Sequence, residues 1–95
     1  MDNTYYIVRC AHSGVFAGNI KHREGREVTM TNVRRLWYWS GAASLSQLAL
    51  EGVKKPGSCK FTVTVSELVV LDAIELIPCT AEAEACIKGV PEWRM

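Results

Sequence analysis

The sequence predicts a single mainly β domain over residues 1–95, with a five-stranded antiparallel sheet that curls into a small barrel and carries two short helices. Its N-terminal part contains three stretches rich in β-branched and aromatic residues, separated by short turns that contain glycine, a pattern typical of antiparallel strands. Two more stretches of this kind follow in the C-terminal half. The hydrophobic content of 48% is that of a folded domain rather than a disordered chain.

The expected strands are residues 5–10, 15–22, 27–39, 61–65 and 68–77. Gly18 lies in the middle of the second strand, where glycine marks a sharp bend or a close approach of another backbone. Asn32 interrupts the alternation of the third strand and indicates a bulge or a corner. Glycine kinks and bulges let a small antiparallel sheet curl, so these two positions favour a barrel.

Two short helices are expected outside the sheet. Ser44 is a suitable N-cap for a helix over residues 45–51, which forms an insert between the third and fourth strands. Thr80 can cap a second helix over residues 81–88, whose early glutamates suit the positive end of the helix dipole. Trp93 follows in an extended tail, and we expect it to dock either on the barrel or on a neighbouring subunit.

The charge and the apolar runs exclude some partners. The formal net charge is +1, whereas a protein that coats nucleic acid through charge alone needs a strongly basic face. The longest apolar run, residues 68–71, is far too short to span a membrane. The chain opens with Met-Asp-Asn-Thr rather than a basic and apolar leader, so we expect a cytoplasmic protein with no membrane partner.

Four cysteines, at positions 10, 59, 79 and 86, form no Cys-x-x-Cys pair. Reduced thiols that pack as small core residues are therefore the expected state. Cys10 and His12 have the spacing of one strand face and would supply two ligands of a metal site, but the remaining ligands would have to come from distant segments. We expect no metal and no other cofactor.

The most informative stretch is residues 31–41, Thr-Asn-Val-Arg-Arg-Leu-Trp-Tyr-Trp-Ser-Gly. Successive side chains of a strand point to opposite faces. The two rows are Arg35, Trp37 and Trp39 on one face, and Arg34, Leu36 and Tyr38 on the other. Each row combines a planar cation, which suits phosphate or carboxylate, with a flat ring that suits a base. The alternative is that the rings fill a small core and the arginines cap its rim.

Binding of a small anionic ligand is the leading functional hypothesis. Residues 40–44 lead into the start of a helix, where free N–H groups favour anions. A phosphate at residues 43–46 and a base stacked on an indole would together describe a nucleotide. The candidate ligand-binding residues are Arg34, Arg35, Trp37, Tyr38, Trp39 and Ser44.

Three other classes of function are weighed against this one. A single-stranded nucleic acid could use the same rings with the basic pair Lys54-Lys55, although the near-neutral charge does not favour it. The aromatic row could equally be an interface with another protein or between subunits, because Tyr, Trp and Arg are enriched at interface hot spots. An enzyme is not expected, since no nucleophile elbow, phosphate loop or paired-carboxylate motif assigns a catalytic residue.

Residues 5–33 carry an apolar-x-Gly-x-apolar pattern at Phe16, Gly18 and Ile20, followed by an acidic turn and an apolar strand. This part of the chain resembles the first half of SH3-like and Sm-like barrels, and the resemblance implies a small-barrel fold. Sm proteins carry an Asp and an Asn for RNA bases in the turn and the next strand. Glu24 and Glu27 stand nearest to those places here, so the chain departs from the Sm pattern of base reading.

Four segments extend a second resemblance over nearly the whole chain: residues 14–18 (Gly-Val-Phe-Ala-Gly), 33–39 (Val-Arg-Arg-Leu-Trp-Tyr-Trp), 41–49 and 77–80 (Ile-Pro-Cys-Thr). They are similar to a family of short proteins of unknown function from tailed phages and prophages. The resemblance implies a phage protein in the cytoplasm of an infected bacterium, without any reaction. In that setting we expect a homo-oligomer that sequesters a nucleotide signal of host defence, or alternatively an inhibitor of a protein interaction or a structural phage protein.

Overall fold

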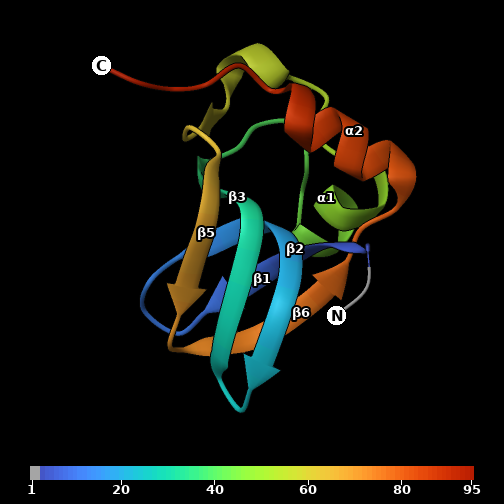
Figure 1. Ribbon diagram of the computed structural model, residues 1–95. Helices are drawn as coiled ribbons and strands as arrows, with labels where there is room; N and C mark the ends of the chain where they lie inside the picture. Colours follow the sequence, from blue (N-terminus) through green and yellow to red (C-terminus); the bar gives the residue numbers. More distant parts are fainter. Residues whose placement is uncertain (1–2) are drawn as a thin grey trace.

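The structure, a computed structural model, describes residues 3–95 and consists of one antiparallel sheet with two α-helices at one end (Figure 1). The strands are β1 (Tyr5–Cys10), β2 (Val15–Glu24), β3 (Glu27–Tyr38), β4 (Lys60–Phe61), β5 (Val65–Val70) and β6 (Ala73–Pro78). The helices are α1 (Leu45–Glu51), the 3₁₀ turn η1 (Pro56–Ser58) and α2 (Ala81–Gly89). The mainly β class and the two helices are thus confirmed.

The strands of the sheet follow the order β4-β3-β2-β1-β6, and β5 pairs with the remaining part of the β3 edge. β4 and β5 therefore share one edge of β3, with Phe61 opposite Leu36 and Val65 opposite Val33. No ladder among residues 3–95 joins β5 to β6, so the sheet is open. A closed five-stranded barrel is not confirmed.

The predicted number of strands is wrong, because six strands lie within the described residues. The stretch 68–77, expected as one strand, holds parts of β5 and β6 with a break at Leu71 and Asp72. The backbone oxygen of Asp72 accepts a hydrogen bond from Ala11 N, and its carboxylate accepts from His12 N and Ser13 N. These bonds to the β1–β2 turn stabilise a corner between β5 and β6. The apolar run of residues 68–77 gave no indication of this corner in the sequence. The stretch 61–65 is likewise not one strand, since it is divided between β4 and β5.

The bulge expected at Asn32 is confirmed. Ala17 and Asn19 are two residues apart on β2, while their partners Arg34 and Thr31 are three residues apart on β3. Asn32 takes up the extra residue with a positive φ of 49°, a conformation that asparagine tolerates better than most residues. The bulge resets which side chains of β3 face inward.

The close backbone approach expected at Gly18 is also confirmed. A Cβ atom at Gly18 would lie 2.9 Å from the backbone oxygen of Thr31 and 2.9 Å from the Cα of Val33. Real Cβ atoms do not come this close to backbone atoms, so only glycine fits opposite the bulge. Gly18 and the bulge together bend the β2–β3 pair.

Two apolar cores lie on the two faces of the sheet. The helix-side core is Tyr5, Ile7, Ala17, Leu36, Leu48, Ala49, Val53, Cys59, Phe61, Ile87 and Val90. The strand-side core is Val8, Cys10, Phe16, Ile20, Val28, Met30, Val33, Val70 and Ala73. β1 contributes to both cores, because the curved sheet wraps around one face while the helices cover the other.

Both helices begin where the capping residues predict. The Ser44 hydroxyl accepts a hydrogen bond from Gln47 N at 3.1 Å, and the Thr80 hydroxyl accepts one from Ala83 N at 3.0 Å. The Thr80 hydroxyl also donates to the backbone oxygen of Leu50 at 2.7 Å, which ties the start of α2 to α1. Across residues 3–95, no helix has the length and apolar content needed to cross a membrane.

Candidate functional site

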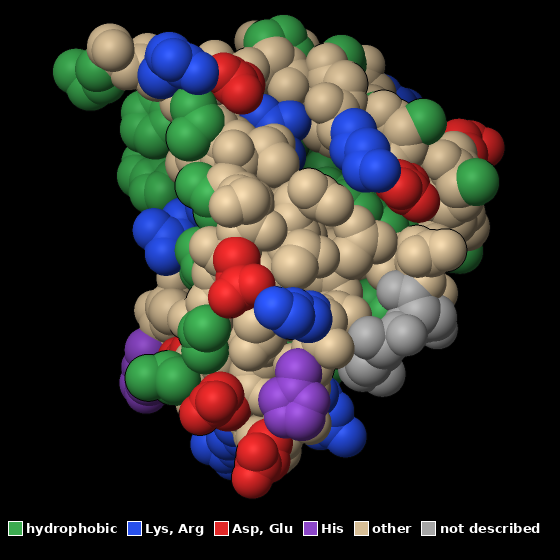
Figure 2. All heavy atoms as spheres, viewed as in Figure 1, with side chains coloured by type: hydrophobic (Ala, Val, Ile, Leu, Met, Phe, Trp, Pro, Cys, Tyr) green, Lys and Arg blue, Asp and Glu red, His purple; other side chains and the backbone are tan. Residues whose placement is uncertain are grey.

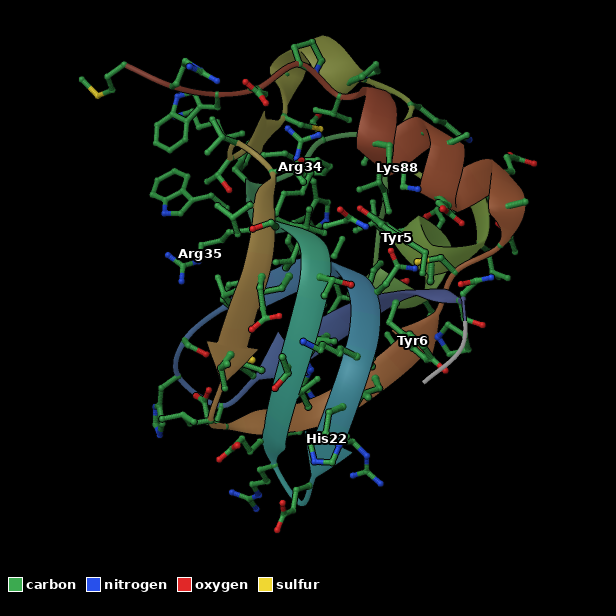
Figure 3. The ribbon with its side chains drawn as sticks, viewed as in Figure 1. Tyr5, Tyr6, His22, Arg34, Arg35 and Lys88 are labelled. Carbon is green, nitrogen blue, oxygen red and sulfur yellow. The ribbon has the colours of Figure 1, made fainter. Side chains whose placement is uncertain are left out.

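The C-terminal half of β3 sends its two arginines to opposite faces of the sheet. Arg34 points inward, toward β4 and the C-terminal end of α2, whereas Arg35 points away from the molecule (Figure 3). Arg34 is 3% exposed and Arg35 belongs to the exposed residues. The two guanidinium groups therefore have different surroundings and need separate treatment.

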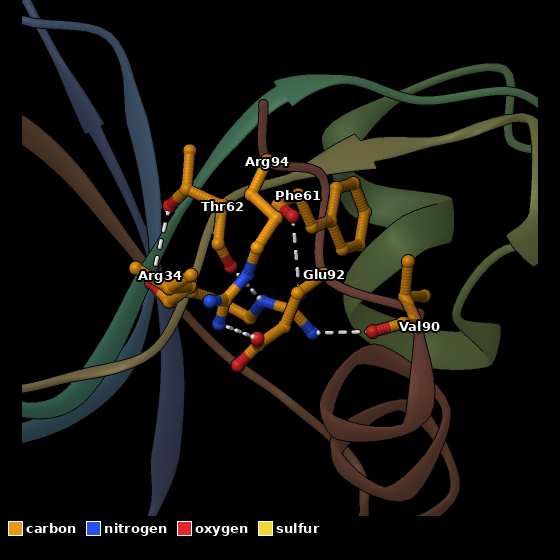
Figure 4. Close-up of polar contacts among 7 residues, drawn as sticks. Arg34, Phe61, Thr62, Val90, Glu92 and Arg94 are labelled. Atoms are coloured by element: carbon orange, nitrogen blue, oxygen red, sulfur yellow. Dashed lines mark hydrogen bonds and ion pairs between the residues drawn. The ribbon is translucent and has the colours of Figure 1, made fainter.

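Arg34 uses its guanidinium to join distant parts of the backbone (Figure 4). It donates through Nε to Thr62 O at 2.9 Å, through Nη1 to Ile87 O and Val90 O at 2.9 Å each, and through Nη2 to Phe61 O at 3.1 Å. Burial lowers the pKa of this guanidinium from its ordinary value, yet an arginine remains charged near neutral pH. Four backbone carbonyls occupy the donors, so Arg34 stabilises the fold and does not face a ligand.

Arg35 lies on an aromatic platform and keeps its donors free. Its Cζ atom is 4.8 Å from the centroid of the Phe16 ring. The backbone of Arg35 is fixed by Thr62, which receives a hydrogen bond from Arg35 N and donates one to Arg35 O. Within residues 3–95, the guanidinium itself has no hydrogen-bond or ion-pair partner. Such a group presents a planar fork of N–H donors to a phosphate or a carboxylate.

Three open hollows meet at Arg35. The largest, about 430 Å³, lies between Arg35, Trp37, Trp39 and the β1–β2 turn. A second hollow of about 360 Å³ extends from Phe16 to the corner between β5 and β6, and a third of about 260 Å³ extends from Phe16 toward Val65. The first two volumes fall within the range of about 300–1,000 Å³ found for small-molecule sites. Arg35 lines all three hollows.

Trp37 is 59% exposed and forms a stacked pair with Trp93 of the C-terminal tail. The ring centroids are 5.3 Å apart and the rings are inclined by 21°. Lys60 Nζ lies 5.2 Å from the Trp37 centroid and 5.5 Å from the Trp93 centroid. Trp93 therefore docks on its own chain, which was the first of the two expectations for the tail.

Tyr38 and Trp39 depart from the predicted alternation. The register of β3 against β4 shifts between Leu36 and Tyr38, so the two rows do not continue to the end of the stretch. Tyr38 is 50% exposed, although it was expected to share a face with the buried Leu36. Trp39 is half-buried against the helix-side core and also lines the largest hollow.

Ser44 acts as a helix cap and does not line the hollow formed by Arg35, Trp37 and Trp39. Its hydroxyl accepts from Gln47 N, and the Gln47 side-chain oxygen accepts from Ala43 N at 2.8 Å. The Ala43 N–H, one of the groups expected to hold a phosphate, is thus used within the chain, and the Ser44 hydroxyl is occupied by Gln47 N. Among the predicted residues, the structure brings Arg35, Trp37 and Trp39 together and separates Arg34, Tyr38 and Ser44 from them.

One comparison with known proteins gives a match. Residues 3–87 match the family described as "Domain of unknown function (DUF6948)". The chain belongs to the DUF6948 family. No match was found among curated proteins, and none among solved structures. The match confirms the expected domain of unknown function, and its description names neither phages nor SH3-like or Sm-like barrels.

In this DUF6948 chain, Asp72 borders the hollow between Phe16 and the β5–β6 corner. Its carboxylate accepts hydrogen bonds from the Ser13 hydroxyl at 2.6 Å, His12 N at 2.6 Å and Ser13 N at 3.0 Å. The Ser13 hydroxyl, followed by the backbone donors, lowers the pKa of Asp72 to about 2. An ionised carboxylate thus lines the same hollow as Arg35.

Sequence reasoning missed several members of this surface. Asp72, Phe16, Lys60 and Trp93 are brought to Arg35 and Trp37 by pairing between distant strands and by the tail. The one local signal was the lone aspartate within the apolar run of residues 68–77. As for metals, no group of three or more His, Cys, Asp or Glu side chains in residues 3–95 is placed to hold an ion.

Proposed function

We propose that this DUF6948 protein binds a small anionic ligand of the nucleotide type at Arg35. The observation that carries the proposal is the free guanidinium of Arg35, which sits on Phe16 where three hollows meet. A guanidinium that has no internal partner gains about 1.5–3 kcal/mol from each hydrogen bond to a charged acceptor. Trp37 and Trp39 in the same hollow supply apolar ring surface for a base.

The role is binding without turnover. Ser13 and Asp72, the polar side chains that border the hollow between Phe16 and the β5–β6 corner with Arg35, are hydrogen-bonded to each other. The Ser13 hydroxyl therefore donates to an acidic carboxylate with a depressed pKa, which is a poor general base near neutral pH. This pairing favours recognition over catalysis.

The biological setting belongs to the same proposal. The segments at residues 14–18, 33–39, 41–49 and 77–80 support a tailed-phage or prophage origin. We propose that the protein acts in the cytoplasm of the infected bacterium as a homo-oligomer and sequesters a nucleotide signal of host defence. The strand order β6-β1-β2-β3-β5 within the sheet is compatible with an open relative of SH3-like and Sm-like barrels.

Isothermal titration calorimetry with a panel of cyclic and NAD-derived nucleotides tests the proposal. We expect heat from at least one nucleotide, and Arg35→Ala should lower its affinity at least about tenfold because a charge-assisted hydrogen bond is lost. Arg23→Ala is the matched control, since Arg23 is exposed on the β2–β3 hairpin and its side chain donates to Gly25 O of the same hairpin. Absence of heat from every nucleotide would overturn the proposal.

A second candidate function is a protein interface on the same side of the molecule. Leu71 is 71% exposed and Val69 is 48% exposed, next to the hollow that contains Arg35. Figure 2 shows hydrophobic side chains gathered on the side of the molecule beside β5, below the C-terminal tail. Leu71→Lys would then lower the mass of the particle in light scattering, whereas nucleotide binding alone would leave this mass unchanged.

Single-stranded nucleic acid remains the third candidate because Lys60 lies beside two indole rings. Affinity for an oligonucleotide would fall steeply between low and moderate salt, since counterions are released from each neutralised phosphate. It would also rise with the length of the oligonucleotide. A single nucleotide bound at Arg35 would show a weak salt dependence and no length dependence.

A further inference from the structure

Arg35 and Trp37 are two residues apart on β3, and both are exposed and line the same hollow. Residues at positions i and i+2 of a strand are separated by about 6.6–6.8 Å along the strand axis. This spacing is about twice the 3.5 Å at which two layers of carbon atoms make optimal contact. One planar ring therefore fits between the Trp37 indole and the Arg35 guanidinium once this group turns from Phe16 toward Trp37.

The space beside these two residues is open. Arg35, Trp37 and Trp39 line the same hollow of about 430 Å³. The Arg35 side chain points outward, away from the body of the molecule (Figure 3). Its guanidinium packs on the Phe16 ring and forms no hydrogen bond or ion pair with any group in residues 3–95. A ligand can thus engage Arg35 without breaking an internal hydrogen bond.

Trp93 stacks on Trp37 but does not line this hollow. One face of the Trp37 indole is therefore backed by Trp93, and Trp37 lines the hollow while Trp93 does not. The backing ring is itself fixed, because Trp93 N donates to Phe61 O at 2.8 Å and Glu92 bridges to Phe61. Trp93 holds the exposed Trp37 in one orientation, so less side-chain freedom is lost when a ring binds.

Buried Arg34 supports this arrangement from inside the molecule. It donates to Phe61 O, the same oxygen that receives Trp93 N, and to Val90 O just before the tail. Lys60 Nζ lies within 5.5 Å of both indole centroids and adds positive charge beside them. The Glu92 and Arg94 side chains pair with each other, so the tail adds little net charge at this point.

We propose that Arg35 and Trp37 form a slot for one planar heteroaromatic ring that carries a phosphate, as in a nucleoside 5′-phosphate. The face of the guanidinium covers the ring while its N–H edge donates to the phosphate. Trp93 is a positioning residue that acts through Trp37 and does not touch the ligand. This inference rests on the proposed function and narrows the ligand to a base with a phosphate, as opposed to a sugar phosphate or inorganic phosphate.

The test compares two probes, adenosine 5′-monophosphate and ribose 5-phosphate, in titration calorimetry. The wild type should bind the nucleotide more tightly by about 5-fold to 150-fold, the range that stacking of one base supplies. Trp37→Ala should reduce this ratio to about one and leave ribose 5-phosphate affinity unchanged. Tyr38→Ala is the matched control, because Tyr38 is a half-exposed neighbour that lines none of the three hollows.

Trp93 has its own test. Trp93→Ala should lower the affinity for adenosine 5′-monophosphate severalfold and leave that for ribose 5-phosphate unchanged, and Trp93→Phe should restore the stacking. A merely structural role of Trp93 would weaken both probes together. Tighter binding of the nucleotide by Trp93→Ala would show that the two indoles compete with the base, and would overturn the slot.

The remaining outcomes separate the slot from the proposed function. Equal affinity of the wild type for the two probes would overturn the slot and leave anion binding at Arg35 standing. This comparison needs no variant, so it is independent of any effect of Trp37→Ala on folding. If neither probe binds, the slot is rejected; if no nucleotide of the wider panel binds either, the proposed function is rejected as well.

Discussion

The guanidinium groups of Arg34 and Arg35 end on opposite faces of β3, one bound to four backbone carbonyls and the other, within residues 3–95, to none. Arg34 joins β4 to the end of α2, and the same contacts fix the strand from which Arg35 projects. Arg35 keeps its charge at the surface, on the ring of Phe16. Two adjacent residues of one type thus have separate surroundings, and we propose separate tasks for them, stability for Arg34 and recognition for Arg35.

Arg34→Ala should lower the free energy of unfolding by at least about 3 kcal/mol. The substitution removes four hydrogen bonds from a charged donor, each worth about 1.5–3 kcal/mol. Thr62 O and Val90 O lose the donor that Arg34 supplies, whereas Phe61 O keeps its bond from Trp93 N and Ile87 O keeps its bond from Val90 N. Urea denaturation followed by circular dichroism gives the value. Arg34→Lys should lose nearly as much, because a single ammonium nitrogen cannot reach the four oxygens.

Arg35→Ala is the control for the Arg34 experiment. Its guanidinium is exposed and makes no hydrogen bond to residues 3–95, so the change in unfolding free energy should stay within about 1 kcal/mol, the size of its cation–π contact with Phe16. Equal destabilisation by the two substitutions would contradict the assignment of separate tasks.

Gly18→Ala should destabilise the fold by about 2 kcal/mol. The added methyl would lie 2.9 Å from Thr31 O and from Val33 Cα, which are backbone atoms of the neighbouring strand and cannot move away cheaply. Thermal unfolding measures the effect. The matched variant is Gly57→Ala, where nothing lies within 4 Å of the new methyl, and its stability should remain within about 0.5 kcal/mol of the wild type. A harmless Gly18→Ala would show that β2 and β3 do not approach as described.

Stability should fall in acid partly through Asp72. Hydrogen bonds from Ser13 and His12 lower its pKa to about 2, below the ordinary value of about 4. A carboxyl with a depressed folded-state pKa stabilises the fold above the unfolded pKa and loses this contribution as pH falls through the folded pKa. The urea midpoint of the wild type should therefore drop between about pH 4 and pH 2.

Asp72→Asn isolates this contribution. The variant should be less stable than the wild type at neutral pH, and the difference should shrink as the pH approaches 2. Glu27→Gln, at an exposed position of β3, is the control for removal of one carboxylate. A constant difference between Asp72→Asn and the wild type from pH 7 to pH 2 would rule out the proposed bonds to the β1–β2 turn.

Cys79 should resist alkylation while the protein is folded. Burial, followed by the charge of Glu84, raises the pKa of this thiol to about 11. At pH 8 the thiolate fraction is then lower by a factor of about 100 than that of an ordinary cysteine, and the thiolate is the nucleophile. Iodoacetamide labelling and mass spectrometry in buffer and in urea measure the protection. Equal rates in both solvents would contradict the burial of Cys79.

Local signals predicted the helices and the distortions of the sheet. Ser44 and Thr80 each cap a helix by accepting a hydrogen bond from the N–H group three residues later. Both interactions are therefore local in the sequence. Gly18 and Asn32 deviate from the strand pattern at the positions where the backbone is bent. Such features can be read from the sequence because glycine and asparagine have distinctive backbone preferences.

Long-range contacts decided what the sequence left open. Alternation placed Arg34 and Arg35 on opposite faces, but the buried face was set by carbonyls of Phe61 and Val90 from distant segments. The corner at Asp72 likewise depends on the β1–β2 turn, about sixty residues earlier. The pairing of Trp37 with Trp93 required the path of the C-terminal tail, which periodicity does not encode.

The most direct measurement of ligand recognition is the ¹⁵N–¹H NMR signal of the Arg35 Nε–H group during titration with the tightest-binding nucleotide. Binding at Arg35 predicts a large, saturable shift of this signal, while the Nε–H signal of Arg34, bound to Thr62 O, stays in place. Arg35→Ala assigns the signal by its disappearance. A nucleotide that binds while the Arg35 signal remains unchanged would contradict the assignment of Arg35 as the anion-binding residue.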